Sequence, residues 1–224
     1  MPSRNIIYTS ILMLVLLQGC KMYMIPEDVD PINEIPMYGG ERVPFQNKKT
    51  DESAEAAEEG WDCLYNKKDL RNAMKFFNKA WMLDSDNPKA YWGMGLVTGI
   101  EAVDENDETR KINMISMSIK LLEKALELDE GNTSIMSSIG KAYIDRACRV
   151  EDNAAKGKDL KKAEEILTTS SKLAPKGSTY LSLSICFYHQ ERYEEAWKLL
   201  QKANDFNYKI PAEYLNNLKN RLNK

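Results

Sequence analysis

The chain has 224 residues, of which 43% are hydrophobic and 29% charged, and its formal net charge is -3. This composition excludes an intrinsically disordered chain, since disorder is typical of low hydrophobicity and high net charge. The mixed charges also argue against a nucleic-acid-binding protein, which would need a basic face. With only 11 glycines and 8 prolines, the composition favours an all-α protein.

The N-terminal residues have the layout of an export signal. Arg4 gives a positive start, residues 6–17 form an apolar run, and Gly19 precedes Cys20. The run has about 12 residues, which is short of the roughly 20 that a membrane-spanning helix needs. The sequence therefore predicts a signal peptide at residues 1–19.

The sequence LQGC at the end of this run resembles the lipobox of bacterial lipoproteins. The resemblance implies cleavage before Cys20 and lipid modification of this cysteine, with more than one acyl chain, which gives stable anchoring. The sorting rule of such lipoproteins, applied to Lys21, implies the outer membrane. We expect an envelope protein that is lipid-anchored at Cys20 and faces the periplasm. A plain signal anchor is the alternative.

Residues 20–52 carry four spaced prolines and no persistent helical or strand pattern. Spaced prolines keep a chain extended and semi-rigid. We therefore predict that this segment is a tether between the lipidated cysteine and a folded body at residues 53–224.

The body contains an internal repeat. The segments FFNKAWMLDSDNPKAYWGMG and LLEKALELDEGNTSIMSSIGKAY align without a gap, ILTTSSKLAPKGSTYLSLSICFY is a third copy, and RYEEAWKLLQKANDF begins a fourth. Each copy predicts a helix with apolar residues at helical spacing, a polar turn, and a second helix that contains a small residue. Neither helix could bury its apolar stripe alone, so neighbouring copies must stack.

These copies resemble tetratricopeptide repeats, in which a 34-residue unit carries small and aromatic residues at fixed positions. Gly60, Gly95 and Gly140 match the first small position of the family. The resemblance covers about residues 53–209 and implies an all-α, tetratricopeptide-like helical-hairpin solenoid. Residues 211–223 look like the C-terminal cap helix of such arrays.

Two repeats are longer than the family period. Gly95 and Gly140 are 45 residues apart, which exceeds the period by 11, about three helical turns. We therefore predict that the second and third hairpins are taller than the others, with residues 99–113 and 145–159 at their tips.

The sequence shows no catalytic constellation. His189 is the only histidine, and neither a metal-ligand spacing nor a phosphate-binding glycine loop occurs. We expect no enzymatic activity, no metal and no cofactor. After Cys20 three cysteines remain. Either they are buried free thiols, or Cys148 and Cys186 form a disulfide.

In the repeat family, the first helix of each hairpin lines a concave groove. The family positions that face this groove, carried onto this sequence, are Trp61, Tyr65, Trp92, Leu96, Ile100, Lys141, Ile144, Leu181, Ile185, Tyr188 and His189. An apolar surface with aromatic residues is typical of a binding site. Alternatively, a tall hairpin or the tether folds back and covers these residues.

The functional hypothesis is a membrane-anchored lipoprotein that acts as a protein-protein interaction scaffold and holds an envelope protein or peptide in this groove. The alternative is a carrier or solute-transport accessory that binds a small apolar ligand or lipid in a closed groove.

Overall fold

The structure is a computed structural model that describes residues 31–223. The predicted signal peptide, Cys20 and the first part of the predicted tether lie outside the described residues. Within the described range the chain is all-helical and has no strand. Its α-helices are α2 (Thr50–Asp62), α3 (Leu70–Leu83), α4 (Pro88–Asp104), α5 (Glu108–Leu128), α6 (Thr133–Ala147), α7 (Asn153–Leu173), α8 (Gly177–His189), α9 (Tyr193–Asp205) and α10 (Ala212–Leu222). Three short helical segments accompany them, η1 (Pro31–Glu34), η2 (Pro36–Gly40) and η3 (Cys63–Lys67).

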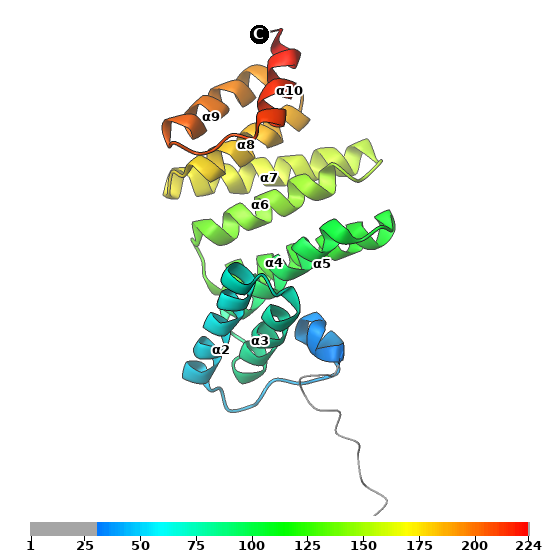
Figure 1. Cartoon of the computed structure of the whole chain (residues 1–224), viewed down its shortest axis with the longest axis vertical. Helices are drawn as coiled ribbons and strands as arrows, with labels where there is room; N and C mark the ends of the chain where they lie inside the picture. The colour runs from blue at the N-terminus through cyan, green and yellow to red at the C-terminus, as the bar shows by residue number, and fades with distance from the viewer. Residues whose placement is uncertain (1–30, 224) are drawn as a thin grey trace, which may run out of the picture.

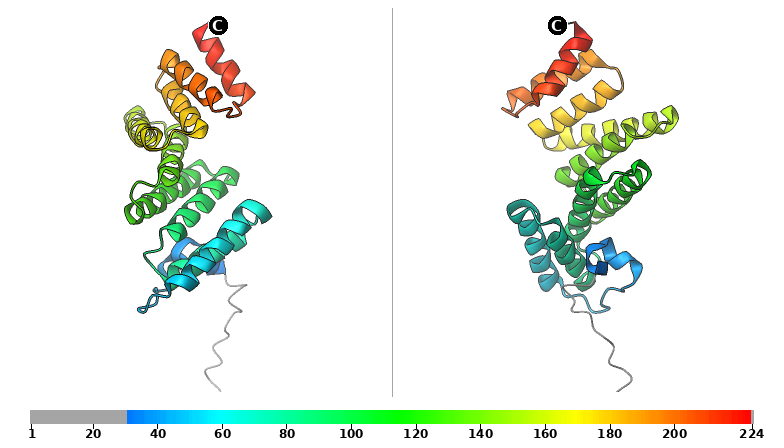
Figure 2. Two further views of the ribbon diagram at one scale, coloured as in Figure 1. Left: turned by 90° about the vertical axis from the view of Figure 1, so that its left-hand side faces the viewer. Right: turned by 45° about the vertical axis from the view of Figure 1, so that its right-hand side comes forward.

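The helices pair as hairpins that stack along the long axis of the molecule (Figure 1). The pairs are α2 with α3, α4 with α5, α6 with α7, and α8 with α9. Two further views show that the helix directions change from one end of the stack to the other (Figure 2). The predicted hairpin solenoid is confirmed. No helix among the described residues combines the length and apolar character that a membrane crossing requires.

Polar residues in the turns begin most of these helices. Each capping side chain accepts a hydrogen bond from a backbone N–H in the first helical turn, a group that otherwise has no partner within the helix. The capping residues are Asp69, Asn87, Asp107, Asn132 and Asp152. The polar turns therefore fix where helices α3 to α7 start.

The predicted small positions allow two helices to approach closely. A Cβ atom added to Gly140 would lie 2.4 Å from Cγ of Leu167, and one added to Gly95 would lie 2.8 Å from Cγ of Leu122. The first repeat has the same arrangement, since a Cβ at Gly60 would lie 2.6 Å from a ring carbon of Phe77.

The second and third hairpins are taller than the others, as predicted. Helices α5 and α7 have 21 residues each, whereas α3 has 14 and α9 has 13. At roughly 1.5 Å per residue the difference is about 10 Å. The short connections after α4 and α6 form the tips.

The C-terminal cap helix is also present. Leu218 of α10 is fully buried in a cluster with Ala196 and Leu200 of α9. Tyr214 of α10 lies 2.7 Å from the Ser184 hydroxyl, and burial raises the pKa of Tyr214 to about 12. Helix α10 therefore covers apolar surface that the last hairpin would otherwise expose to solvent.

Residues 33–49 form an ordered strap on α3, although the sequence places them within the predicted tether. Asn78 of α3 is fully buried and holds the strap: its Oδ1 accepts from the Met37 amide at 2.7 Å, and its Nδ2 donates to the carbonyl oxygens of Asn33 and Ile35 at 2.8 Å. Tyr38 is 4% exposed. This part of the segment packs on the body, and α2 begins at Thr50, before the predicted boundary at residue 53.

Candidate functional site

Four of the predicted groove residues line one cavity of about 300 Å³. Tyr65 comes from η3, Leu96 and Ile100 from α4, and Lys141 from α6. Tyr65 is 63% exposed and Ile100 is 43% exposed, so the cavity opens to solvent. A carrier would require a closed cavity, and this one is open.

Lys141 is a cation at this cavity without an ion-pair partner among the described residues. Desolvation lowers the pKa of its ammonium group, and no nearby charge opposes this effect. The neighbouring carboxylate, Asp145, accepts instead from Nε of Arg149 at 3.1 Å. The cavity thus combines apolar side chains with the Lys141 ammonium group, the Asp145 carboxylate and the hydroxyls of Ser118 and Ser138.

Trp61 and Trp92 support the cavity rather than line it. Their ring centroids are 4.8 Å apart, and the Trp61 ring is 5.0 Å from that of Phe77. Nε1 of Trp92 donates to the hydroxyl of Ser138, a residue that does line the cavity, at 3.2 Å. The two tryptophans therefore join the first three hairpins at the base of the groove.

Three predicted groove residues are packing residues in this structure. Ile144 is 7% exposed and Leu181 is 8% exposed, and Ile185 packs against the main core. None of the three lines the cavity. Their side chains are used to join α6 and α8 to their neighbours, so they present little surface to a partner.

Tyr188 and His189 lie apart from the cavity. The Tyr188 ring is 5.5 Å from that of Tyr193 and 5.7 Å from that of Tyr214, so it contacts α9 and the cap helix. His189 lines a separate hollow with Lys156 of α7. The residues at the predicted groove positions therefore do not share one cavity in the structure.

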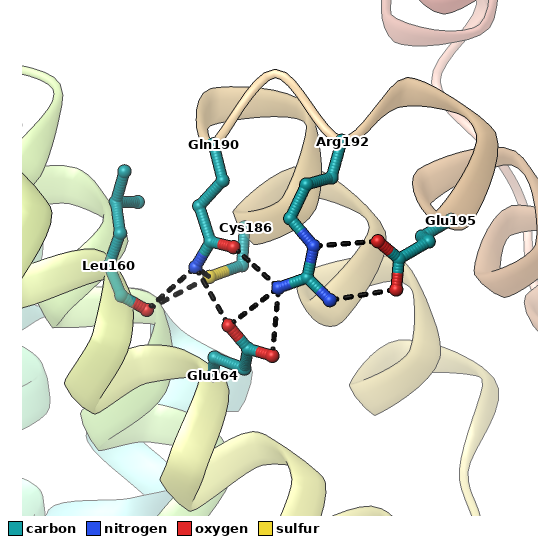
Figure 3. Close-up of polar contacts among 6 residues, drawn as sticks. All are labelled: Leu160, Glu164, Cys186, Gln190, Arg192 and Glu195. Carbon is teal, nitrogen blue, oxygen red and sulfur yellow. Dashed lines mark hydrogen bonds and ion pairs between the residues drawn. The ribbon is translucent and has the colours of Figure 1, made fainter.

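A polar network joins α7 to the turn between α8 and α9 (Figure 3). Nη1 of Arg192 donates to both carboxylate oxygens of Glu164 at 2.9 Å, and its Nε and Nη2 donate to Glu195 at 2.7 Å. Gln190 also donates to Glu164, at 3.0 Å. These bonds raise the pKa of Arg192 and keep it charged. No sequence pattern indicated this network, which fixes the third repeat against the fourth.

A second missed contact joins the two long helices of the third hairpin. Nε and Nη2 of Arg146 donate to the two carboxylate oxygens of Asp159, both at 2.8 Å. The hydrogen bonds to Asp159 raise the pKa of Arg146. The two residues are 13 positions apart in the sequence. Their pairing cannot be predicted from that spacing, because it depends on how α6 and α7 pack in the hairpin.

The three cysteines among the described residues, Cys63, Cys148 and Cys186, are free thiols. Cys186 is buried, and desolvation raises its pKa to about 12. Cys148 is exposed, and its Sγ lies 3.3 Å from Nε2 of His189. The disulfide between Cys148 and Cys186 is therefore absent from the structure. Among the described residues no group of three or more histidine, cysteine or carboxylate side chains could hold a metal ion.

Neither the strap nor a hairpin tip covers the cavity. Strap residues Asn33, Tyr38 and Phe45 line a different hollow, on α3. The cavity is lined by η3, α4, α5 and α6 alone. The groove is therefore open to a partner along its first half.

No protein-family model matches the chain, and no curated protein matches it in sequence. Two solved structures of MamA match its fold. A MamA double mutant of strain RS-1 has a TM-score of 0.52 and 17% identity, over 70% of this chain and 75% of that one. MamA from Desulfovibrio magneticus RS-1, from residue 41 to its end, has a TM-score of 0.52 and 15% identity, over 70% and 76%. The fold is a tetratricopeptide-like helical-hairpin solenoid.

Proposed function

We propose that the protein is an interaction scaffold that binds an envelope protein or peptide in the groove cavity. The observation that carries this proposal is the cavity of about 300 Å³ lined by Tyr65, Leu96, Ile100 and Lys141. An exposed aromatic ring, aliphatic walls and a single cation are the chemistry of a peptide-binding site. Lys141 favours a partner that places a carboxylate beside an apolar side chain.

The scaffold works by preorganisation and performs no covalent chemistry. The cavity walls belong to helices that are held together by the paired tryptophans, by Ser138 and by the close approach at Gly95. A rigid surface loses little conformational entropy when a partner binds, so more of the contact energy appears as affinity.

The membrane part of the proposal rests on the sequence LQGC. We propose that Cys20 is acylated and anchors the scaffold at the outer membrane, facing the periplasm. Replacement of Cys20 by alanine should move the protein out of the membrane fraction. An equal distribution of wild type and Cys20→Ala would contradict the anchor.

The binding test is a pull-down from detergent-solubilised envelope with the wild type and a Tyr65→Ala, Ile100→Ala variant. Both side chains are exposed, so their truncation should leave the fold intact, unlike truncation of the packed residues Trp92 and Tyr188. Leu173→Ala is the matched control, because Leu173 is 59% exposed and lies outside the cavity.

The proposal predicts that the wild type and Leu173→Ala capture the same partner and that the double variant captures at least tenfold less, as expected when two anchors of about 1 kcal/mol each are lost. Circular dichroism shows whether all three proteins are equally helical. If the folded double variant captured as much partner as the wild type, the cavity would not be the binding site.

A further inference from the structure

Exposed apolar side chains gather on the strap. Val43 is 82% exposed, Phe45 54% and Ile35 49%, and Val43 is the most exposed large apolar side chain in the described part of the protein. Single exposed apolar residues are common on protein surfaces, but these three, named the patch, lie within 11 residues of one segment, which suits an apolar partner.

The backbone that carries these side chains is fixed to the body. The amide of Phe45 donates to the Met82 carbonyl at 2.9 Å, and the amide of Lys49 donates to the Leu83 carbonyl at 2.9 Å. The bonds of Asn78 hold the preceding turn. The strap therefore presents Val43 and Phe45 to solvent from an ordered backbone.

The strap crosses one end of the molecule, opposite to α10 and the C-terminus (Figure 1). Only 11 peptide units separate Cys20 from Pro31, where the described residues begin. Fully extended, this length spans at most about 40 Å. An anchor at Cys20 therefore keeps the strap end of the solenoid near the bilayer.

Two basic side chains near the patch have acidic partners, while the guanidinium of Arg42, next to Val43, lies 4.4 Å from the centre of the Tyr38 ring. Lys48 pairs with Asp86 and lies 3.2 Å from Asp84, and Arg71 lies 3.0 Å from Glu34. The contact made by Val43 and Phe45 themselves would depend on apolar burial, and a bilayer of neutral phosphatidylcholine isolates it from attraction to anionic headgroups.

We propose that the strap is the membrane-facing surface of the protein and that Val43 and Phe45 enter the interfacial layer of the bilayer. This inference rests on the membrane anchoring in the proposed function. A lipid surface is the occupant because the chain reaches the membrane within a few tens of ångströms of the patch. The contact holds the solenoid upright, with α10 away from the membrane.

The test uses the full chain, produced in a bacterial membrane, purified in detergent and reconstituted into phosphatidylcholine vesicles. A Cys148→Ser background removes the exposed native thiol, while Cys63 and Cys186 are buried. A nitroxide label is attached at Val43→Cys and, as a matched control, at Leu173→Cys, which is exposed on α7. Power-saturation spectroscopy compares relaxation by oxygen, which enriches in lipid, with relaxation by a water-soluble nickel chelate.

The proposal predicts an oxygen-to-nickel ratio several-fold higher at residue 43 than at residue 173, with no change at high salt. Flotation in a density gradient shows whether the protein is bound to the vesicles. If it is bound and the two ratios are equal, the strap contact is wrong and the anchor at Cys20 is retained. Failure of the protein to float with the vesicles would overturn both.

Discussion

Asn78 of α3 aligns with the polar residues Glu123, Thr168 and Gln201 of the other copies, and it has no exposed surface. Its amide makes three hydrogen bonds to strap backbone groups, and Met37 and Tyr38 there have positive φ values of 51° and 53°. Non-glycine residues adopt such angles at a cost, so the bonds of Asn78 offset local strain.

Asn78→Ala should release the strap. The change removes the Asn78 partner of the Met37 amide and of the Asn33 carbonyl, while the Ile35 carbonyl keeps its bond from the Tyr38 amide at 3.0 Å. We expect a loss of about 2–3 kcal/mol in the free energy of unfolding. Hydrogen exchange at residues 35–45 should accelerate. Lys79→Ala, an exposed change one residue away, is the control and should alter neither quantity. Unchanged exchange in Asn78→Ala would show that other contacts hold the strap.

His189 should make stability depend on pH. Burial, assisted by the charge of Lys156, lowers the pKa of His189, so the folded state favours the neutral ring. As pH falls through the ordinary histidine pKa of about 6.5, the unfolded chain binds the proton first and stability is lost.

His189→Gln removes this titration while keeping a side chain of similar size. Between about pH 7.5 and about pH 5.5, the urea midpoint of the variant should fall less than that of the wild type. Carboxylate groups titrate in both proteins and cancel in the comparison. The same pH slope for both proteins would mean that His189 titrates equally in the folded and unfolded states.

At the scale of the helices, the close approach of α6 and α7 depends on Gly140. Gly140→Ala would place a Cβ 2.4 Å from Leu167, and such overpacking costs about 1–3 kcal/mol. Gly157→Ala on α7 is the matched control, since nothing lies within 4 Å of its Cβ and alanine favours the helix by about 0.5–1 kcal/mol. The two denaturation midpoints should move in opposite directions. A stabilised Gly140→Ala would contradict the packing.

The helices and their lengths could be predicted because the copies of the repeat can be aligned, so that each copy supports the helix assignment of the others. Aligned copies mark Gly95 and Gly140 as packing positions, and their spacing reports the two tall hairpins. The strap could not be predicted in this way. Its order depends on Asn78, 45 residues beyond Asn33, and a segment held by one buried amide shows no periodicity.

At the scale of the whole molecule, the groove was predicted only in part. Family positions indicate which helix face is concave, and four of the residues at these positions, Tyr65, Leu96, Ile100 and Lys141, line one cavity. They cannot show how far the cavity extends, because that depends on how each hairpin packs on the next. Near the C-terminus the cap helix contacts Tyr188.

The central claim is that the groove cavity receives a partner. The most direct measurement is photo-crosslinking in cells, with a benzophenone amino acid in place of Tyr65 and, in a parallel strain, of Leu173. Both positions are exposed, but only Tyr65 lines the cavity. We expect a discrete adduct from position 65 that position 173 does not give, and Ile100→Ala should weaken it. The same adducts from both positions, or none from position 65, would contradict it.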